Sequence, residues 1–143
     1  MFIGEFQHSI DEKGRLSVPV KFRPDLSIGL VLTRGLDGCL WLYPIGKWQG
    51  IVNEVAKLPF TQKNARSFSR FILSGAMDLK IDKAGRIILP KYLADYAGIK
   101  SKVVVIGMND RLEIWSENRW QSFKEEMEEN SDEVAENLSS IGL

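Results

Sequence analysis

Two short stretches of the chain carry the residue types best suited to hold an anion. The sequence DEKGR runs from Asp11 to Arg15, and the sequence DKAGR runs from Asp82 to Arg86. The planar guanidinium group of arginine can donate two parallel hydrogen bonds, either to a phosphate or to the O6 and N7 acceptors of guanine. An aspartate four residues earlier can hold that group in place. Each stretch therefore has the composition of an arginine-based anion contact.

Catalytic chemistry is not indicated elsewhere in the sequence. The single histidine, His8, and the single cysteine, Cys39, cannot build a cluster of metal ligands. A nucleophile pair made from them would lack a third group to orient it. No glycine-rich phosphate loop of the Walker or dinucleotide type occurs. We therefore expect no enzymatic activity, metal, cofactor or small-molecule substrate.

Both stretches lie in an internal repeat, and repeats decide the architecture of a chain. Residues 10–19, IDEKGRLSVP, align with residues 81–90, IDKAGRIILP, with identical Ile, Asp, Gly, Arg and Pro. Raising the offset by one aligns residues 31–49 with residues 103–121, including the Trp-Gln pair that ends each range. The repeat therefore covers about 40 residues per copy, which is too long for a chance match.

Each copy predicts the same order of short elements: strand, turn, strand, short helix, strand, turn, strand. Residues 6–10 and 77–81 show the alternation of half-buried strands. The Asp-x-x-Gly sequences suit tight turns, because Asp bonds to backbone amides and Gly adopts positive φ. Pro19 and Pro90 suit the first turn of a helix, whereas Pro24 is expected to cut the first copy's helix short.

Four short strands have little core of their own, so we expect the two copies to pack together and hide their edges in one barrel. The predicted fold is mainly β with short helices (α+β), with pseudo-two-fold symmetry between the repeats. Residues 45–58, 65–73 and 120–127 have helical spacing, and their aromatic side chains are expected in the core. The predicted division is residues 5–47 and 76–119 for the two halves, 48–75 for a helical linker, and 120–143 for a C-terminal helix and acidic tail.

Charge is unevenly distributed, although the formal net charge is zero. Residues 117–143 hold eight acids and two bases, so residues 1–116 hold eleven acids and seventeen bases. A basic body suggests an anionic partner, although a tail that only aids solubility has the same composition. Arg66 and Arg70 share one helix face, which we interpret as a solvated face or a subunit contact, with phosphate contact as the alternative.

The tandem arrangement resembles the MraZ family of bacterial transcriptional regulators. The resemblance is carried by the repeated Asp-x-x-x-Arg turn, the apolar residue and proline that follow it, the opening MFIGEFQHSIDEKGR and the LSGA before the second copy. It covers about residues 5–47 and 76–119 and the connecting helices. The resemblance implies two halves of the SpoVT/AbrB type that form a swapped-hairpin, double-psi-like β-barrel.

The same resemblance implies a function, partners and a location. Proteins of this family bind double-stranded DNA at short direct repeats with G-rich cores, upstream of their own division and cell-wall gene cluster, as repressors or activators. They assemble into homo-oligomeric rings, octamer-like or larger, in the cytoplasm and at the nucleoid. The sequence also shows neither a signal-peptide pattern nor an apolar run of membrane-spanning length, so we expect no membrane partner.

Our hypothesis gives the residues of the two turns three roles. The arginines contact base edges, the lysines hold phosphates, and the aspartates and glycines brace the turns. In that order the residues are Arg15 and Arg86, Lys13 and Lys83, and Asp11, Asp82, Gly14 and Gly85. Base readout and phosphate contact stay open as alternative roles of the arginines. In a further alternative, the aspartate–arginine pairs are salt bridges that only staple the turns.

The two turns are not identical, and two other functions stay open. Glu12-Lys13 aligns with Lys83-Ala84, so the turns present different charge. One alternative function is an antitoxin of the same fold class with a disordered acidic tail, although such antitoxins usually carry one copy and dimerise. The other is an assembly scaffold without a nucleic-acid role. The acidic tail is assigned no DNA contact, and it either covers a neighbouring subunit's basic surface or competes with DNA.

Overall fold

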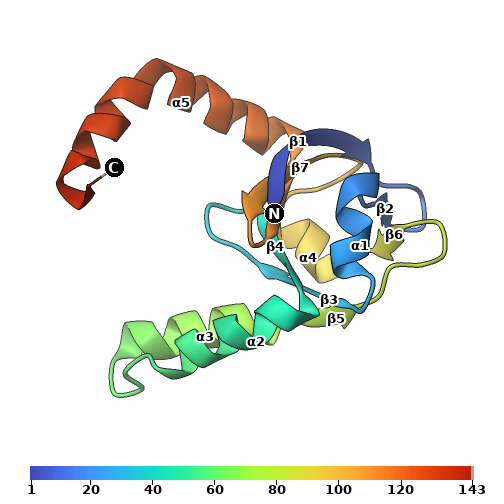
Figure 1. Cartoon of the computed structure of the whole chain (residues 1–143), viewed down its shortest axis with the longest axis horizontal. Helices are drawn as coiled ribbons and strands as arrows, with labels where there is room; N and C mark the ends of the chain where they lie inside the picture. Colours follow the sequence, from blue (N-terminus) through green and yellow to red (C-terminus); the bar gives the residue numbers. More distant parts are fainter. Residues whose placement is uncertain (143) are drawn as a thin grey trace.

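The protein is built from eight strands in two antiparallel sheets with helices around them (Figure 1). These counts refer to residues 1–142, which the computed structural model describes. The strands are β1 (Phe2–Ser9), β2 (Arg15–Ser17), β3 (Leu30–Arg34), β4 (Leu40–Pro44), β5 (Met77–Leu79), β6 (Arg86–Ile88), β7 (Lys102–Asn109) and β8 (Leu112–Ser116). The α-helices are α1 (Arg23–Leu26), α2 (Ile45–Ala56), α3 (Lys63–Gly75), α4 (Lys91–Tyr96) and α5 (Glu117–Asn137), and Val20–Phe22 and Ser139–Ile141 form short 3₁₀ helices.

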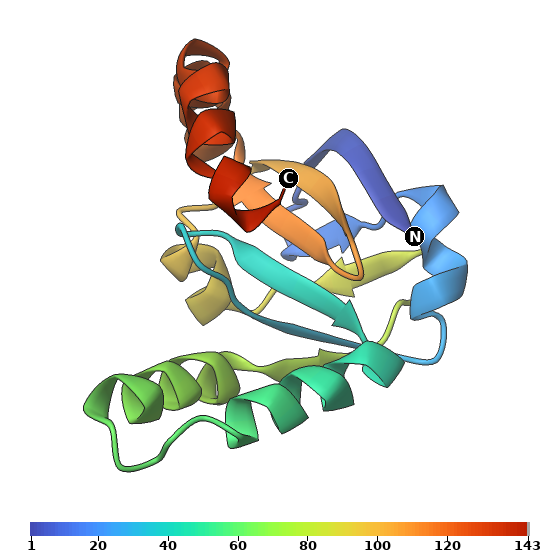
Figure 2. The same cartoon turned by 60° about the vertical axis from the view of Figure 1, so that its left-hand side comes forward.

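The two halves are related by symmetry, and each half contributes its first strand to the strands of the other half. The larger sheet has the order β1-β7-β8-β4-β3-β5, which reads the same backwards when each strand is replaced by its counterpart in the other copy. β1 pairs with β7 of the second copy along its whole length, and β5 pairs with β3 of the first copy. The short strands β2 and β6 pair with each other in the smaller sheet (Figure 2). This arrangement confirms the predicted α+β fold made from two repeats.

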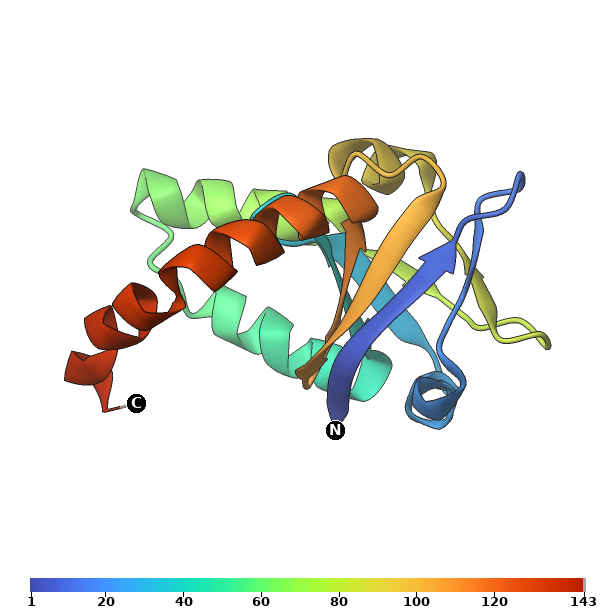
Figure 3. The ribbon, with the colours of Figure 1, turned by 90° about the horizontal axis from the view of Figure 1, so that it is seen from above.

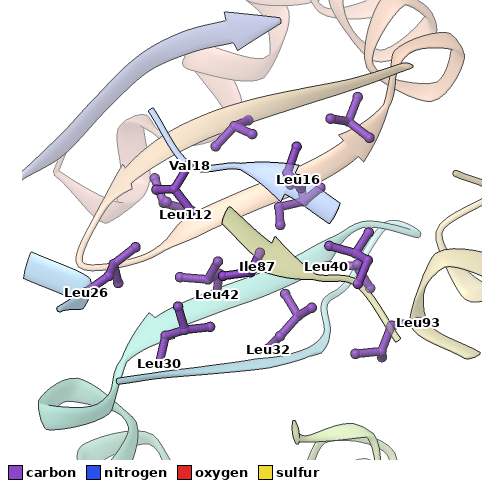
Figure 4. Packing of buried hydrophobic residues seen from close by; sticks show 14 of the residues in the cluster. Leu16, Val18, Leu26, Leu30, Leu32, Leu40, Leu42, Ile87, Leu93 and Leu112 are labelled. Carbon is purple, nitrogen blue, oxygen red and sulfur yellow. The ribbon is translucent and has the colours of Figure 1, made fainter. Parts of the chain in front are cut away.

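One apolar core, shared by both halves, lies between the two sheets. Leu16 at the centre of β2 and Ile87 at the centre of β6 face each other in the register and are fully buried. Figure 4 shows both side chains within the same cluster as Leu40 and Leu42 of β4 and Leu112 of β8. Because each half supplies about half of this cluster, neither copy would have a complete core alone.

Helices α2 and α3 form a helical hairpin that is attached to the barrel near the C-terminus of α3 (Figure 2). The hydroxyl group of Thr33 donates to the carbonyl oxygen of Ile72 at 2.6 Å. The guanidinium group of Arg34 donates to the carbonyl oxygen of Phe71 at 2.9 Å. The last carbonyls of a helix lack intrahelical donors, so these bonds from β3 satisfy the end of α3 and fix the hairpin to the sheet.

Helix α5 begins directly after β8 and extends away from the barrel (Figure 1). Ser116 caps its first turn by accepting a hydrogen bond from the backbone N–H of Arg119 at 3.2 Å. Its base is held by aromatic packing, with ring centroids of Trp115 and Trp120 5.4 Å apart and those of Trp120 and Phe123 5.2 Å apart. One turn beyond Trp120, Lys124 forms an ion pair with Glu5 of β1 at 3.5 Å.

Two predictions from the sequence are corrected by the structure. Pro24 does not end the first short helix but lies in the first turn of α1, where its missing N–H leaves no hydrogen bond unmade. The aromatic side chains of the predicted helices are only partly in the core: Trp48, Phe71 and Trp120 are half-buried, and Phe123 is 42% exposed. The reason is that α2, α3 and α5 reach beyond the sheets and leave part of their apolar faces uncovered.

The predicted helices themselves are confirmed, since α2, α3 and α5 cover residues 45–56, 63–75 and 117–137. The four-part division of the chain stays a prediction, and its last residue, 143, lies outside the described residues. Within residues 1–142, no helix has both the length and the hydropathy that crossing a membrane requires.

Candidate nucleic-acid interface

The two Asp-x-x-Gly-Arg turns project from the same side of the barrel, at the two ends of the ribbon formed by β2 and β6. Figure 3 shows both projecting on the side opposite to the long helices α2, α3 and α5. Each turn is bonded to the strand that follows the other one: the N–H of Val18 donates to the carbonyl of Gly85 at 2.9 Å, and the N–H of Leu89 donates to that of Gly14 at 2.8 Å. The structure therefore places all eight predicted turn residues on the same side of the barrel, in two turns that are linked through β2 and β6.

In the first turn, Asp11 holds both the backbone and the arginine side chain. Its Oδ1 accepts the backbone N–H groups of Lys13 and Arg15, both at 2.9 Å. Its Oδ2 accepts the Nε–H of Arg15 at 2.6 Å. The N–H of Gly14, whose φ is 78°, donates to the carbonyl oxygen of Asp11 at 3.0 Å. The left-handed conformation at this position is the reason for glycine.

The second turn repeats this geometry. Oδ1 of Asp82 accepts the backbone N–H groups of Ala84 and Arg86 at 2.9 Å, and Oδ2 accepts the Nε–H of Arg86 at 3.0 Å. Gly85 adopts a φ of 80°. Ala84 takes the place of Lys13, since only its backbone N–H is used. The side chain at this position is therefore free to differ between the copies.

Both aspartates are held in the ionised form. The backbone N–H of Arg15 is the main cause that lowers the pKa of Asp11 below its ordinary value, and that of Arg86 does the same for Asp82. Each arginine uses Nε for its aspartate, and its Nη groups make no hydrogen bond to any residue of the described chain. With side chains 29% and 32% exposed, the two guanidinium groups are oriented and still have donors left for a ligand.

Arg23 is a residue of this region that the sequence analysis did not single out. Its Nε donates to the carbonyl oxygen of Val18 at 2.8 Å, and its guanidinium group lies against Gly85, where a Cβ atom would collide with it. No such group covers Gly14. The counterpart of Arg23 at the repeat offset is Ala94. The repeat alignment could have flagged this difference, but only the exchange of strands places Arg23 beside the second turn.

The second turn is consequently more positive than the first. The first turn contains two acids and two bases, and the second contains one acid and two bases. Arg23 adds a base there, because it lines a shallow hollow of about 270 Å³ together with Asp82 and Lys83. Lys13 and Lys83 are exposed at the tips of their turns. The two turns therefore differ in their attraction for an anion.

The remaining candidates for chemistry do not join this site. Cys39 is fully buried and donates to the carbonyl of Leu36, and burial, aided by nearby carboxylates, raises the pKa of its thiol to about 12. Such a thiol is not a nucleophile near neutral pH. Partial burial and the charge of Arg23 lower the pKa of His8. Among the described residues, no three His, Cys, Asp or Glu side chains gather as metal ligands would.

The fold and the paired turns together define a class of protein: an interlocked tandem-repeat β-barrel that presents two aspartate-braced arginines at one end. The family described as "MraZ protein, putative antitoxin-like" matches residues 1–71 and again residues 72–140. The chain is 47% identical to the Transcriptional regulator MraZ of Syntrophomonas wolfei subsp. wolfei, 50% to that of Ligilactobacillus salivarius and 48% to that of Pediococcus pentosaceus. Each match spans 143 residues and the full length of both chains. The chain therefore belongs to the MraZ family of transcriptional regulators.

Proposed function

We propose that the chain is a transcriptional regulator that binds double-stranded DNA through its two braced turns. The observation that supports this best is the state of Arg15 and Arg86. Each is fixed through Nε by an aspartate, keeps its Nη groups available, and stands on one of the paired strands β2 and β6, where Arg15 is opposite Ile88 and Arg86 is opposite Ser17. An arginine that only stabilised its turn would need the ion pair alone, whereas here the Nη groups of each arginine also remain available as hydrogen-bond donors to a ligand.

The arginines and lysines have different roles in this proposal. The Nη groups of Arg15 or Arg86 donate to the O6 and N7 atoms of a guanine. Lys13 and Lys83 hold phosphates, which positions the protein without reading sequence. A guanidinium group that is already held by aspartate loses less side-chain freedom on binding than a free one. Asp82 and its counterpart in the first turn thus support recognition without touching DNA.

Assembly is part of the proposal, because two arginines per chain make a weak contact. A homo-oligomeric ring, octamer-like or larger, places several pairs of turns on successive direct repeats and raises the avidity by orders of magnitude. The zero net charge agrees with this, since a single neutral chain is only weakly attracted to DNA. The proposed targets are short repeats with G-rich cores upstream of the protein's own division and cell-wall gene cluster, and the proposed location is the cytoplasm and the nucleoid.

The test is a comparison of two duplexes, one from upstream of the protein's own gene and one scrambled, across a series of salt concentrations. We expect a preference for the native duplex and a log–log salt slope of several units. Arg15→Ala and Arg86→Ala should each reduce the preference about tenfold. Lys13→Ala and Lys83→Ala should weaken binding to both duplexes equally and reduce the salt slope by about one.

Lys47→Ala is the matched control, because Lys47 is an exposed base on α2, away from the turns. It should leave both affinities unchanged. Equal binding of the wild-type protein to the two duplexes would leave only a non-specific architectural role. No binding to either duplex at low salt would overturn the proposal and leave the turns as structural staples.

A second candidate is an antitoxin, since the description of the matching family contains the words "antitoxin-like". That function was expected to use a disordered acidic tail that wraps a toxin. Here the acidic segment is a helix from Glu117 to Asn137, which favours the regulator. Co-purification of the product of a neighbouring gene in a fixed ratio with this chain would favour the antitoxin instead.

A further inference from the structure

Two apolar surfaces on the long helices remain uncovered. The first, which we call the α5 groove, is a hollow of about 720 Å³ along one face of α5. Its walls include Trp115, Phe123, Met127 and Val134, with Glu126 and Asn130 between them. Phe123 is 42% and Val134 is 37% exposed. Large apolar side chains at helical spacing normally face a partner surface, and this face has none within residues 1–142.

The second surface, which we call the hairpin groove, lies between α2 and α3 and has a volume of about 330 Å³. Its apolar walls include Val55, Leu58 and Leu73, and Phe60 lies at its edge in the connecting loop. Phe60 is 81% exposed. An aromatic side chain of this size, held on a helical hairpin and almost fully in solvent, is typical of an anchor at a protein interface.

The two surfaces carry opposite charge. Helix α3 contains three bases and no acid, and two of these bases, Arg66 and Arg70, line the hairpin groove. Helix α5 contains eight acids and two bases. Glu126 lines the α5 groove, and Glu133 lies two helical turns further along the same side. The charges therefore complement each other around the two apolar patches.

The two grooves do not cover each other within one chain. Figures 1 and 2 show α5 leaving the barrel on one side and the α2–α3 hairpin on the other. Both arms lie away from the turns that carry Arg15 and Arg86 (Figure 3). A second copy of the chain can thus engage either groove while the turns stay accessible.

We propose that the hairpin of one copy docks into the α5 groove of the next copy, with Phe60 as the apolar anchor and α3 facing the acidic side of α5. This inference rests on the assembly part of the proposed function and names the surfaces that carry it. The two surfaces are different and are separated on the molecule, so the contact is head-to-tail. Repetition of such a contact closes a ring or continues as a chain, and it does not stop at a dimer.

The first test uses two variants that each damage one surface. Phe60→Glu damages the hairpin groove, and Val134→Glu damages the α5 groove; both sites are exposed, so folding should be unaffected. We expect the wild-type chain to be a large assembly and each variant to fall to the single-chain mass of 16.2 kDa, measured by light scattering at equal concentration. In a mixture of the two variants, the intact hairpin of Val134→Glu can dock into the intact α5 groove of Phe60→Glu. The mixture should therefore form a one-to-one heterodimer and nothing larger.

Unchanged mass of either variant, or a mixture that stays at the single-chain mass, would overturn the proposal. A wild-type chain that is itself a monomer would also overturn the proposal.

The second test exchanges the charges. Arg70→Glu and Glu126→Arg should each weaken assembly, and the chain that carries both changes should regain it, because the complementary charges are restored with reversed sign. Glu128→Arg is the matched control, since Glu128 is two residues from Glu126, lies on the far side of α5 by helical spacing and should not alter the mass. Failure of the double variant to recover while each single variant is folded would contradict the pairing of α3 with α5.

Assembly and DNA binding are separated by testing the same proteins on DNA. Monomeric Phe60→Glu should keep weak binding at low salt through intact turns and lose the preference that depends on avidity. Arg15→Ala should lower the preference for the native duplex about tenfold and keep the assembled mass. If DNA binding fails in the wild type while the head-to-tail contact is found, the regulator proposal fails alone. If DNA binding holds and the mass tests fail, only the docking proposal is lost.

Discussion

The backbone N–H of Val18 donates to the carbonyl oxygen of Gly85 at 2.9 Å, and so joins the first copy of the repeat to the turn of the second. The reciprocal bond runs from Leu89 to Gly14 at 2.8 Å. Neither turn is therefore shaped by its own copy alone. A change in one turn is transmitted to the strand that follows the other, which makes the pair of turns a single structural unit.

The two turn glycines should differ in their tolerance of alanine. Gly14→Ala places a side chain at a φ of 78°, which costs roughly 1–2 kcal/mol. Gly85→Ala has the same strain and also collides with the guanidinium group of Arg23, so its loss of unfolding free energy should be larger. Denaturant unfolding at one fixed protein concentration measures both.

The cause of that difference can be tested with a double-mutant cycle. Arg23→Ala added to Gly85→Ala removes the collision and should recover part of the extra loss. The same change added to Gly14→Ala should recover nothing. Equal effects in the two backgrounds would show that Arg23 does not press on the second turn.

Asp11→Asn should separate specificity from affinity. The amide oxygen can still accept the backbone N–H groups of Lys13 and Arg15, so the turn persists. The charged pair with Arg15 Nε is lost, and the turn gains one unit of positive charge. We expect equal or tighter binding to the scrambled duplex and a lower preference for the native one. A parallel loss on both duplexes would mean that the aspartate acts only on folding.

Acid should release the aspartates from the turns. The pKa values of Asp11 and Asp82 are lowered in the folded protein from an ordinary value of 3.8. A lowered folded-state pKa gives a stability contribution that is present above the unfolded-state pKa and lost as the pH falls through the folded-state value. The difference in unfolding free energy between wild type and Asp11→Asn/Asp82→Asn should therefore be constant above about pH 4 and shrink below it. A constant difference at all pH values would contradict this.

The repeat makes much of the fold and of the site predictable from the sequence. The matched positions of Asp11 and Asp82, and of Arg15 and Arg86, predict two equivalent turns. The exchange of first strands is not predictable from the residues themselves, since alternation along residues 6–10 fixes which face of a strand is buried and leaves its neighbour open. That neighbour could be named only through the family resemblance.

The features that sequence reasoning missed depend on this exchange or on exposure. Arg23 reaches Gly85 because the two copies interlock, and nothing near position 23 in the sequence indicates a contact with residue 85. Phe60 and Phe123 have the apolar character of core residues, and only their positions beyond the sheets, in the α2–α3 loop and on α5, leave them in solvent. Hydrophobic spacing identifies a face that will be covered, but not the chain that covers it.

Cys39 should be unreactive in the native protein. It is fully buried, and its raised pKa of about 12 keeps the thiol protonated at mildly alkaline pH. Iodoacetamide should label no thiol in the native chain and one thiol per chain after unfolding. A Lys47→Cys variant supplies an exposed thiol as the comparison, and it should react at once. Native Cys39 that reacts as fast as this added cysteine would mean that the turn between β3 and β4 opens readily.

The attachment of the helical hairpin should depend on one buried hydroxyl group. Thr33 is fully buried, and its Oγ1 donates to the carbonyl of Ile72 at 2.6 Å. Thr33→Val keeps the shape of the side chain but leaves that carbonyl without its donor, which should cost about 1–3 kcal/mol. Thr33→Ser keeps the donor and removes only a methyl group, for which about 0.8 kcal/mol is expected. Hydrogen exchange in the last turn of α3 should accelerate in the valine variant and stay near wild type in the serine variant.

The hairpin should remain folded in the valine variant, because Arg34 still bonds to Phe71. The valine variant should nevertheless assemble less tightly, because docking requires a hairpin that is held rigidly. Equal exchange rates in the two variants would place the anchor on Arg34 instead.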